Sequence, residues 1–308
     1  MRSDSTVNLG FYLTPVTPPL FGREGKPEDD IVVLGIPFDG AASRIPGQRF
    51  APRKVREVSV ELETFSPELG VNVEEIGYRD AGDLPVVTDY AVMQNFTTKV
   101  VEELRDSGKL PIVIGGDHSV TFPVVSTLAA RSEELLVLVF DAHMDLRDEW
   151  PWGVRLSHAT VMRRLLESSG SVSVAYYSPR AFSREEYEYA RSSSRVKIVR
   201  NARELRELVE SSEKVYISLD IDAVDPAYAP GTGTPEPMGL APQEVASALR
   251  VAVSHAQEVA GFDVVEVNPL VDCNEITSLL AAKLVMEFLF ACYRYEKCGA
   301  RQARVNFS

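Results

Sequence analysis

Carboxylate and imidazole side chains gather at four points of the sequence, each at the end of a short apolar run. The residues at these points are His118, Asp141, His143, Asp145, Asp220, Asp222 and Glu266. Alternate side chains of an extended chain point to the same side, so residues 141, 143 and 145 can converge on one point, as can 220 and 222. Because ligands of open parallel sheets bind at the carboxyl ends of the strands, this placement predicts an active site there.

Metal ions are the natural partners of so many carboxylates in one small space, since like charges would otherwise force protonation. An Asp-x-Asp pair alone could be a single cation site or part of a turn. The prediction of a metal site therefore depends on the histidines and aspartates occurring together at several strand ends. Oxygen-rich donors with imidazoles and no thiolate favour Mn²⁺ or Mg²⁺. All of these residues except Glu266 are candidate ligands, and six ligands suit two ions better than one. A pair of ions can make hydroxide available at neutral pH, which points to hydrolysis.

The elements that must position these residues repeat one theme: an apolar run, polar residues, then a helical stretch. We expect strands at 31–36, 111–114, 135–140, 172–176, 197–199, 215–219 and 258–267, and helices such as 91–107, 242–255 and 276–293. Continuous hydrophobicity implies strands that are buried on both faces. The sequence therefore predicts one α/β domain over 1–308, a three-layer αβα arrangement with a central, mostly parallel sheet, and an extended arm at about 1–30.

The 308 residues include 32 Lys and Arg against 45 Asp and Glu, a formal net charge of −13. This sign argues against nucleic acid and membrane as partners and agrees with a small cationic one. The N-terminal segment has no apolar stretch behind a basic start, so we expect no secretory signal and a cytoplasmic location. The apolar stretch 278–293 is expected to form a packed amphipathic helix. Three cysteines, Cys273, Cys292 and Cys298, are expected to be reduced and mostly buried.

Four segments resemble the binuclear manganese ureohydrolases, the family of arginases, agmatinases and their relatives, and most of all an archaeal-type agmatinase. They are Gly-Gly-Asp-His-Ser at 115–119, Asp-Ala-His-Met-Asp at 141–145, Ser-His-Ala-Thr at 157–160 and the long, specific segment 218–237. The likeness covers most of the chain, from 32–37 to 279–284. One segment departs from it: 175–182 is Ala-Tyr-Tyr-Ser-Pro-Arg-Ala-Phe, where relatives usually carry a Gly-Ile-Arg-Ser-like sequence.

By this resemblance, the first manganese ion would be held by His118, Asp141, Asp145 and Asp220, and the second by Asp141, His143, Asp220 and Asp222. His158 is similar to the histidine that delivers a proton to the leaving amine, and Glu266 to the carboxylate that orients the guanidinium group. Asp117 resembles a residue that steadies the ligand loop. Family members usually form trimers or hexamers, so the resemblance implies a homo-oligomer.

The substrate depends on the loop after Asp145, because arginine and agmatine differ by one carboxylate. Asp148 and Glu149 would repel a carboxylate and attract an ammonium group, which favours agmatine, hydrolysed to putrescine and urea. Arg147 and Arg155 argue the other way, for arginine or a guanidino acid. Aminopropylagmatine remains an alternative substrate. Two other functions also remain: hydrolysis of a formimino group on the same metal centre, and metal binding without turnover.

Overall fold

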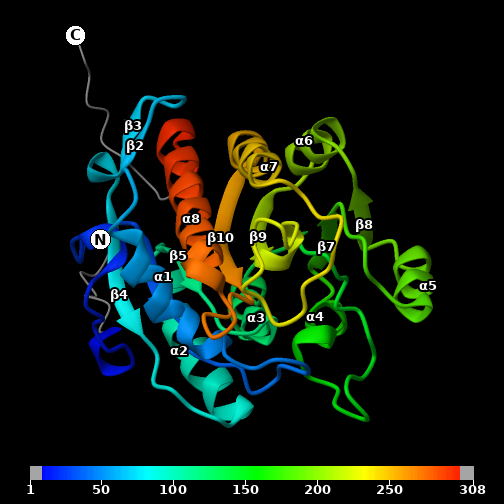
Figure 1. Cartoon of the computed structure of the whole chain (residues 1–308). Coiled ribbons are helices and arrows are strands. Elements are labelled where there is room, and N and C mark those ends of the chain that lie inside the picture. The colour runs from blue at the N-terminus through cyan, green and yellow to red at the C-terminus, as the bar shows by residue number, and fades with distance from the viewer. Residues whose placement is uncertain (1–8, 299–308) are drawn as a thin grey trace.

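The computed structural model describes residues 9–298, and a sheet of eight parallel strands forms their centre (Figure 1). The strands are β1 (Ile31–Gly35), β4 (Tyr78–Asp83), β5 (Leu110–Ile114), β6 (Leu135–Phe140), β7 (Val172–Tyr177), β8 (Val196–Val199), β9 (Lys214–Asp220) and β10 (Glu258–Val265). A small antiparallel pair, β2 (Phe65–Ser66) and β3 (Val71–Asn72), lies apart. The helices are α1 (Ala51–Ser59), α2 (Tyr90–Asp106), α3 (Thr121–Ala129), α4 (Val161–Ser168), α5 (Arg184–Ser192), α6 (Ala202–Glu210), α7 (Pro242–His255) and α8 (Ile276–Tyr295).

Two layers of helices cover the sheet, and each layer builds its own core. Helices α1, α6, α7 and α8 pack on one face, and α2, α3, α4 and α5 on the other (Figure 1). Within β1, Ile31 and Val33 belong to the first core, whereas Val32 and Leu34 belong to the second. Both faces of the strands are therefore apolar, which explains the continuous hydrophobic runs. The predicted three-layer α/β class is confirmed.

The order of the strands across the sheet is β4-β1-β5-β10-β9-β6-β7-β8. Strands β9 and β10 come last in the chain, yet they lie between β5 and β6. The four strands whose ends carry the predicted site residues are therefore direct neighbours. In open α/β sheets, the carboxyl edge at such a change of strand order is where ligands bind.

Helix α8 is more deeply buried than the sequence suggested. We expected an amphipathic helix at 278–293, but every residue from Leu284 to Cys292 is buried, because α8 packs against both α1 and α7 over the sheet. By length and composition this helix could cross a membrane, but 72% of its apolar window is buried inside the protein. A central core helix accounts for the apolar stretch.

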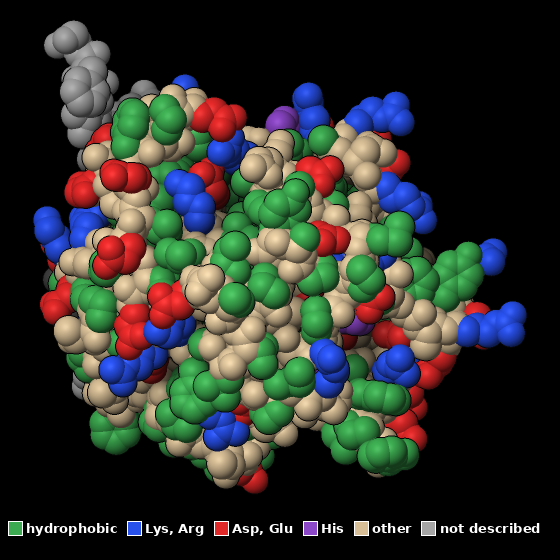
Figure 2. Space-filling view, in the orientation of Figure 1, with side chains coloured by type: hydrophobic (Ala, Val, Ile, Leu, Met, Phe, Trp, Pro, Cys, Tyr) green, Lys and Arg blue, Asp and Glu red, His purple; other side chains and the backbone are tan. Residues whose placement is uncertain are grey.

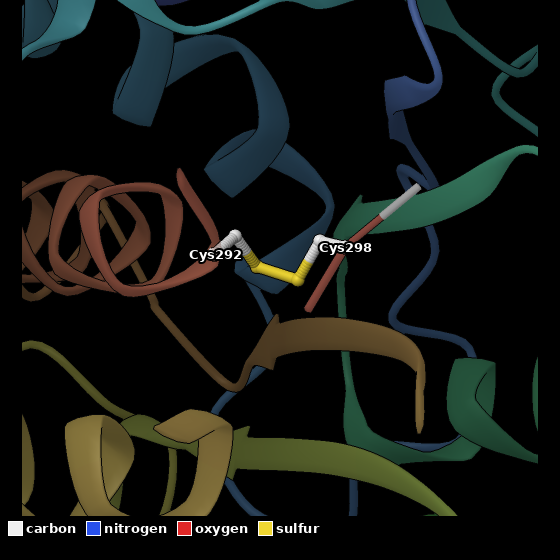
Figure 3. The surroundings of a disulfide bond; sticks show 2 residues. All are labelled: Cys292 and Cys298. Atoms are coloured by element: carbon white, nitrogen blue, oxygen red, sulfur yellow. A yellow bond between two sulfur atoms is a disulfide. The ribbon is translucent and has the colours of Figure 1, made fainter. Parts of the chain in front are cut away.

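A disulfide bond near the end of α8 corrects the expectation of three reduced thiols. Cys292 is bonded to Cys298, with 5.1 Å between their Cα atoms (Figure 3). Cys273 is free but exposed rather than buried. The helix ends at Tyr295, and Glu296 takes a left-handed conformation that turns the chain back toward the helix. This turn brings together two cysteines that the sequence spacing did not mark as a pair.

The edge strand β4 was not predicted, because three of its six residues are charged. Its carboxylates face Arg56 of α1, whose side chain is fully buried. The guanidinium group binds Asp80 through two bonds of 2.7 and 2.9 Å and Asp83 through one of 2.5 Å. Asp80 also accepts the backbone N–H of Leu20, so it holds the segment 9–30 against the body. The first eight residues of the expected arm lie outside the described residues.

Replacing Arg56 by alanine is expected to lower the free energy of unfolding by about 3–5 kcal/mol, because Asp80 and Asp83 lose their buried partner. Denaturant unfolding followed by circular dichroism measures this difference. Arg53→Ala is the matched control: the Arg53 side chain is 73% exposed and pairs with Glu57 on the same helix, so about 0.5 kcal/mol is expected. Equal effects of the two substitutions would contradict the role of Arg56.

Candidate metal centre and active site

His118 and three carboxylates form the first part of a buried cluster at the carboxyl edge of the sheet. His118 lies in the turn between β5 and α3, and its Nδ1 atom is 3.1 Å from Asp141, 3.0 Å from Asp145 and 3.3 Å from Asp220. Asp141 and Asp145 follow β6, and Asp220 ends β9. All four side chains are buried. The structure thus brings these four predicted residues to one point.

A second group of side chains shares Asp141 with the first. The Nδ1 atom of His143 lies 3.4 Å from Asp141 and 3.1 Å from Asp222. These three residues could hold one cation, and His118, Asp141 and Asp145 could hold another. Because one carboxylate belongs to both groups, the two candidate sites lie side by side, as a binuclear centre requires.

Burial and mutual repulsion make it unfavourable for all the carboxylates of this cluster to be ionised at once. Burial, and after it the charge of Asp141, raises the pKa of Asp145 to about 6. Burial, together with Asp222 and Asp141, raises the pKa of Asp220 well above its usual value. Burial lowers the pKa of His118, but the neighbouring carboxylates outweigh it and raise that pKa well above the ordinary value. Full ionisation of the carboxylates therefore calls for added positive charge within the cluster.

Two buried atoms in the cluster, His118 Nδ1 and Asp141 Oδ2, have no hydrogen-bond partner within residues 9–298. On the other side of the ring, His118 Nε2 lies 3.0 Å from Ser218 Oγ, whose hydroxyl donates to Asp263 at 2.6 Å. Ser218 therefore accepts a hydrogen bond from Nε2, so that in the neutral ring, the form that binds a metal ion, the lone pair is on Nδ1 and faces the carboxylates. An imidazole lone pair among carboxylate oxygens is a donor set that suits Mn²⁺ or Mg²⁺.

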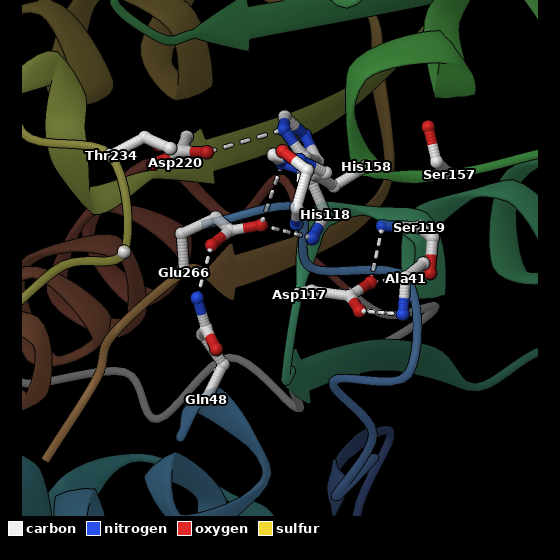
Figure 4. Close-up of polar contacts among 12 residues, drawn as sticks. Ala41, Gln48, Asp117, His118, Ser119, Ser157, His158, Asp220, Thr234 and Glu266 are labelled. Atoms are coloured by element: carbon white, nitrogen blue, oxygen red, sulfur yellow. Dashed lines mark hydrogen bonds and ion pairs between the residues drawn. The ribbon is translucent and has the colours of Figure 1, made fainter. Parts of the chain in front are cut away.

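Glu266 lies between the cluster and His158, directly after β10 (Figure 4). Its Oε1 atom accepts the backbone N–H of His118 at 2.8 Å, and its Oε2 atom accepts from Gln48 at 2.9 Å. Burial raises the pKa of Glu266 to about 7. Glu266 has a φ of 64° and Asp145 a φ of 51°, a left-handed backbone that is unfavourable for residues with a Cβ atom. Such strain is concentrated at functional sites in proteins.

The ring of His158 is held by Ser43. The Ser43 hydroxyl oxygen lies 2.7 Å from His158 Nε2, and the Ser43 backbone N–H donates to the same atom at 3.3 Å. Trp150 donates its indole N–H to the Ser43 oxygen at 3.0 Å. This network assigns Nε2 as an acceptor, so the ring hydrogen is placed on Nδ1, which lies 3.6 Å from Glu266. The imidazole is thus oriented by neighbours on both sides.

A cavity of about 590 Å³ opens beside the cluster. It is lined by His143, Asp145, His158 and Asp220, and its other charged lining residues are Arg44, Arg147, Glu186 and Glu236. Figure 2 shows a histidine side chain deep in a hollow of this face, with acidic and basic side chains around it. A small molecule in the cavity would therefore touch members of the cluster and His158 at once.

The structure does not bring Asp148 and Glu149, which were predicted to bind the substrate, to this cavity. Asp148 binds Arg164 at 2.7 Å and lies 3.1 Å from Arg155, so its charge is satisfied elsewhere. Glu149 is exposed. Of the two arginines that the sequence analysis weighed against agmatine, Arg155 also lies outside the cavity, whereas Arg147 lines it.

The unusual segment 175–182 supports the cavity wall through Arg180. Its guanidinium group donates to four backbone carbonyls, at distances of 2.7–3.1 Å, those of Asp222, Ala223, Glu236 and Pro237. Its own backbone N–H donates to the carbonyl of Ala142 at 2.8 Å. One residue therefore joins the loop after β9 to the loop after β6, both of which carry members of the cluster.

Several residues of this site were not predicted from the sequence: Ser43, Gln48, Arg180, Ser218 and Asp263. Two of them left a signal in the sequence. Ser218 lies two residues before Asp220 and therefore faces the same side of β9. Asp263 interrupts an otherwise apolar strand, and a carboxylate in that position must find hydrogen-bond donors. It accepts from three hydroxyl groups, those of Thr121, Tyr216 and Ser218.

Known proteins with a similar sequence and fold have been identified. Residues 29–291 match the family described as the arginase family. The chain is 40% identical to an agmatinase of Pyrococcus horikoshii, with 83% of this chain and 89% of that one covered. It is 38% identical to the N(1)-aminopropylagmatine ureohydrolase of Thermus thermophilus, with 81% and 87% covered. The crystal structure of an agmatine ureohydrolase of Thermoplasma volcanium is similar with a TM-score of 0.77 and 34% identity, covering 88% and 92%.

Replacing Ser218 by alanine is expected to weaken the binding of Mn²⁺ by roughly 10- to 100-fold, because the Nε2 hydrogen of His118 loses its acceptor and the ring loses its orientation. Competition with a fluorescent chelator measures the affinity. Ser211→Ala is the control, since that hydroxyl bonds only the carbonyl of Leu208 at the end of α6. Unchanged Mn²⁺ affinity in the folded Ser218 variant would show that this hydrogen bond does not orient a metal ligand.

Proposed function

The chain belongs to the arginase family of ureohydrolases, and on that premise we propose that it hydrolyses agmatine to putrescine and urea. The observation that carries this proposal is the pair of candidate cation sites that share Asp141, one of which is fully buried and contains the unpartnered Nδ1 atom of His118. Hydrolysis of a guanidinium group needs a strong nucleophile, a group that orients the cation and a proton donor for the leaving nitrogen. A candidate for each role lies around this cluster.

The proposed cofactors are two Mn²⁺ ions. Their ligands would be the six residues of the cluster: His118, Asp141, His143, Asp145, Asp220 and Asp222. When bound, such a pair makes hydroxide available at neutral pH. The hydrogen bond from His118 to Ser218 keeps the opposite ring nitrogen free to act as a ligand.

Two further residues would act on the substrate. Glu266 would orient the guanidinium group, because a carboxylate can accept two parallel N–H bonds from it. Its hydrogen bonds with His118 and Gln48 fix the carboxylate in place beforehand. His158 would give a proton to the leaving nitrogen, a role that suits imidazole near neutral pH. Since Ser43 already holds the ring, His158 needs no rearrangement during the reaction.

A substrate with an amine tail is supported from two sides. The similar protein of Pyrococcus horikoshii is an agmatinase. Arg147, the residue in the cavity that argued for a carboxylate tail, lies 3.7 Å from Glu186 and stacks on the ring of Trp150 with its guanidinium carbon 4.5 Å from the ring centre. Its charge is therefore largely balanced within the protein. The Thermus thermophilus relative makes aminopropylagmatine the second candidate substrate.

The proposal is tested by measuring urea release after the protein has been stripped with a chelator and reloaded with Mn²⁺. Agmatine, aminopropylagmatine, arginine and guanidinobutyrate are compared in parallel. We expect urea from agmatine, no activity before Mn²⁺ is returned, and none in His143→Ala. Turnover that persists in the stripped protein, formamide as product, or urea only from a carboxylate-bearing substrate would refute the proposal.

Replacing Glu266 by glutamine is expected to lower kcat/KM for agmatine by about 100-fold, because the buried guanidinium loses its charged partner. The shape of the side chain is nearly preserved, so the thermal midpoint and the Mn²⁺ content should stay close to those of the wild type. Steady-state kinetics and metal analysis of the same preparation separate the two effects. A variant with full activity would remove Glu266 from the site.

A further inference from the structure

The charged side chains that line the cavity beyond the metal cluster differ in how many partners they have within the protein. Glu186 is buried, and its two oxygens accept the backbone N–H groups of Leu146 at 3.2 Å and Ser183 at 2.7 Å. It is also the carboxylate nearest to Arg147. The Ser183 hydroxyl also donates to Glu186, at 2.8 Å, so this carboxylate has three hydrogen bonds and a nearby arginine within the protein and has less capacity left for a ligand.

Glu236 differs from Glu186 in having no partner. Its side chain makes no hydrogen bond or ion pair with any residue from 9 to 298, although it is partly buried and lines the cavity. The Glu236 carboxylate is therefore open to a ligand that enters the cavity. A cation in the cavity would supply the missing partner.

The backbone of Glu236 is nevertheless fixed relative to the metal cluster. The Nη2 group of Arg180 donates to the carbonyls of Glu236 and Asp222, both at 2.7 Å. Two residues earlier, Thr234 donates its hydroxyl to the Asp222 carboxylate at 3.3 Å. Glu236 is therefore presented at a set distance from Asp222 by contacts that do not involve its own side chain.

The cavity connects Glu236 with the metal cluster. Glu236 lines the same cavity of about 590 Å³ as the cluster residues Asp145 and Asp220. In agmatine, six bonds of about 1.5 Å join the guanidinium carbon to the primary amine nitrogen, which projects to about 7 Å. A substrate with its guanidinium group at the cluster can thus place its ammonium group beside Glu236.

Resting on the function proposed above, we propose that Glu236 binds the primary ammonium group of the substrate and so selects amine-tailed guanidines. Asp148 and Glu149, which were expected from the sequence to bind this group, do not line the cavity. A carboxylate tail would instead turn to Arg44, which lines the cavity and donates to the carbonyl of Gly233 at 2.9 Å. Arg44 therefore already has a partner within the protein, whereas the Glu236 carboxylate bonds no residue from 9 to 298.

The test compares wild type with Glu236→Gln on two substrates, agmatine and butylguanidine, which has the same carbon chain but no charge at its end. In the variant, KM for agmatine is expected to rise roughly 10- to 100-fold, as for the loss of a charged hydrogen bond, while kcat/KM for butylguanidine stays the same. Inhibition by putrescine should weaken by a similar factor. Glu188→Gln is the control, since that side chain is exposed on α5 and paired with Arg184.

The outcomes separate this assignment from the function on which it rests. No urea from any guanidine in the wild type would refute the proposed function and the assignment together. Urea from agmatine with an unchanged KM in Glu236→Gln would overturn the assignment alone, as would an equal loss on both substrates, which indicates general damage to the cavity. A loss of agmatine selectivity in Glu149→Gln instead would return the role to the loop after Asp145.

Discussion

Mutual repulsion among buried carboxylates at the carboxyl edge of the sheet is the constraint on which the rest of the structure depends. Four aspartates and two imidazoles from three strands share one enclosed space. Only elements that cannot move apart keep such a cluster together, and the neighbouring strands β5, β10, β9 and β6 are such elements. Because helices bury both faces of these strands, the ends that carry the cluster are the ends of a rigid core.

Hydrogen bonds from residues that do not belong to the cluster hold its side chains in place. Asp263 accepts hydrogen bonds from three hydroxyl groups, one of which is that of Ser218. Ser218 in turn bonds Nε2 of His118, which orients the ring with Nδ1 toward the carboxylates. Asp117 accepts the backbone N–H groups of Ser119 and Ala41, so it joins the turn of His118 to the loop that carries Ser43 and thereby orients His158 (Figure 4). The cluster and the residues around the cavity are therefore one connected unit, in which polar groups are satisfied by neighbours rather than by water.

The sheet and the cluster could be predicted because both follow from short-range rules. Strands buried on both faces leave continuous apolar runs, and side chains that converge from one strand leave a period of two. The loops follow no such rule, since their course depends on distant partners. Gln48 reaches Glu266 across 218 positions, and Asp148 turns to Arg164 rather than to the cavity. Strand β4 escaped prediction for the same reason: its charges are stable only because Arg56 lies beneath it.

Selectivity among guanidines cannot come from the cluster, because the guanidinium group is common to all the candidate substrates. In the assignment proposed above it comes from charges farther along the cavity, where a charge without a partner among residues 9–298 is free to bind the tail of the substrate. Arg147 is balanced by Glu186, whereas the Glu236 side chain has no charged partner among the residues that the structure describes. Arg180 bonds the carbonyls of both Asp222 and Glu236. The loop proposed to bind the ammonium group of the substrate is therefore connected to the cluster proposed to hold the metal ions. A change in the loop that moved Glu236 would therefore also disturb the backbone of Asp222, so with the roles proposed above substrate choice and metal binding would be coupled in this protein.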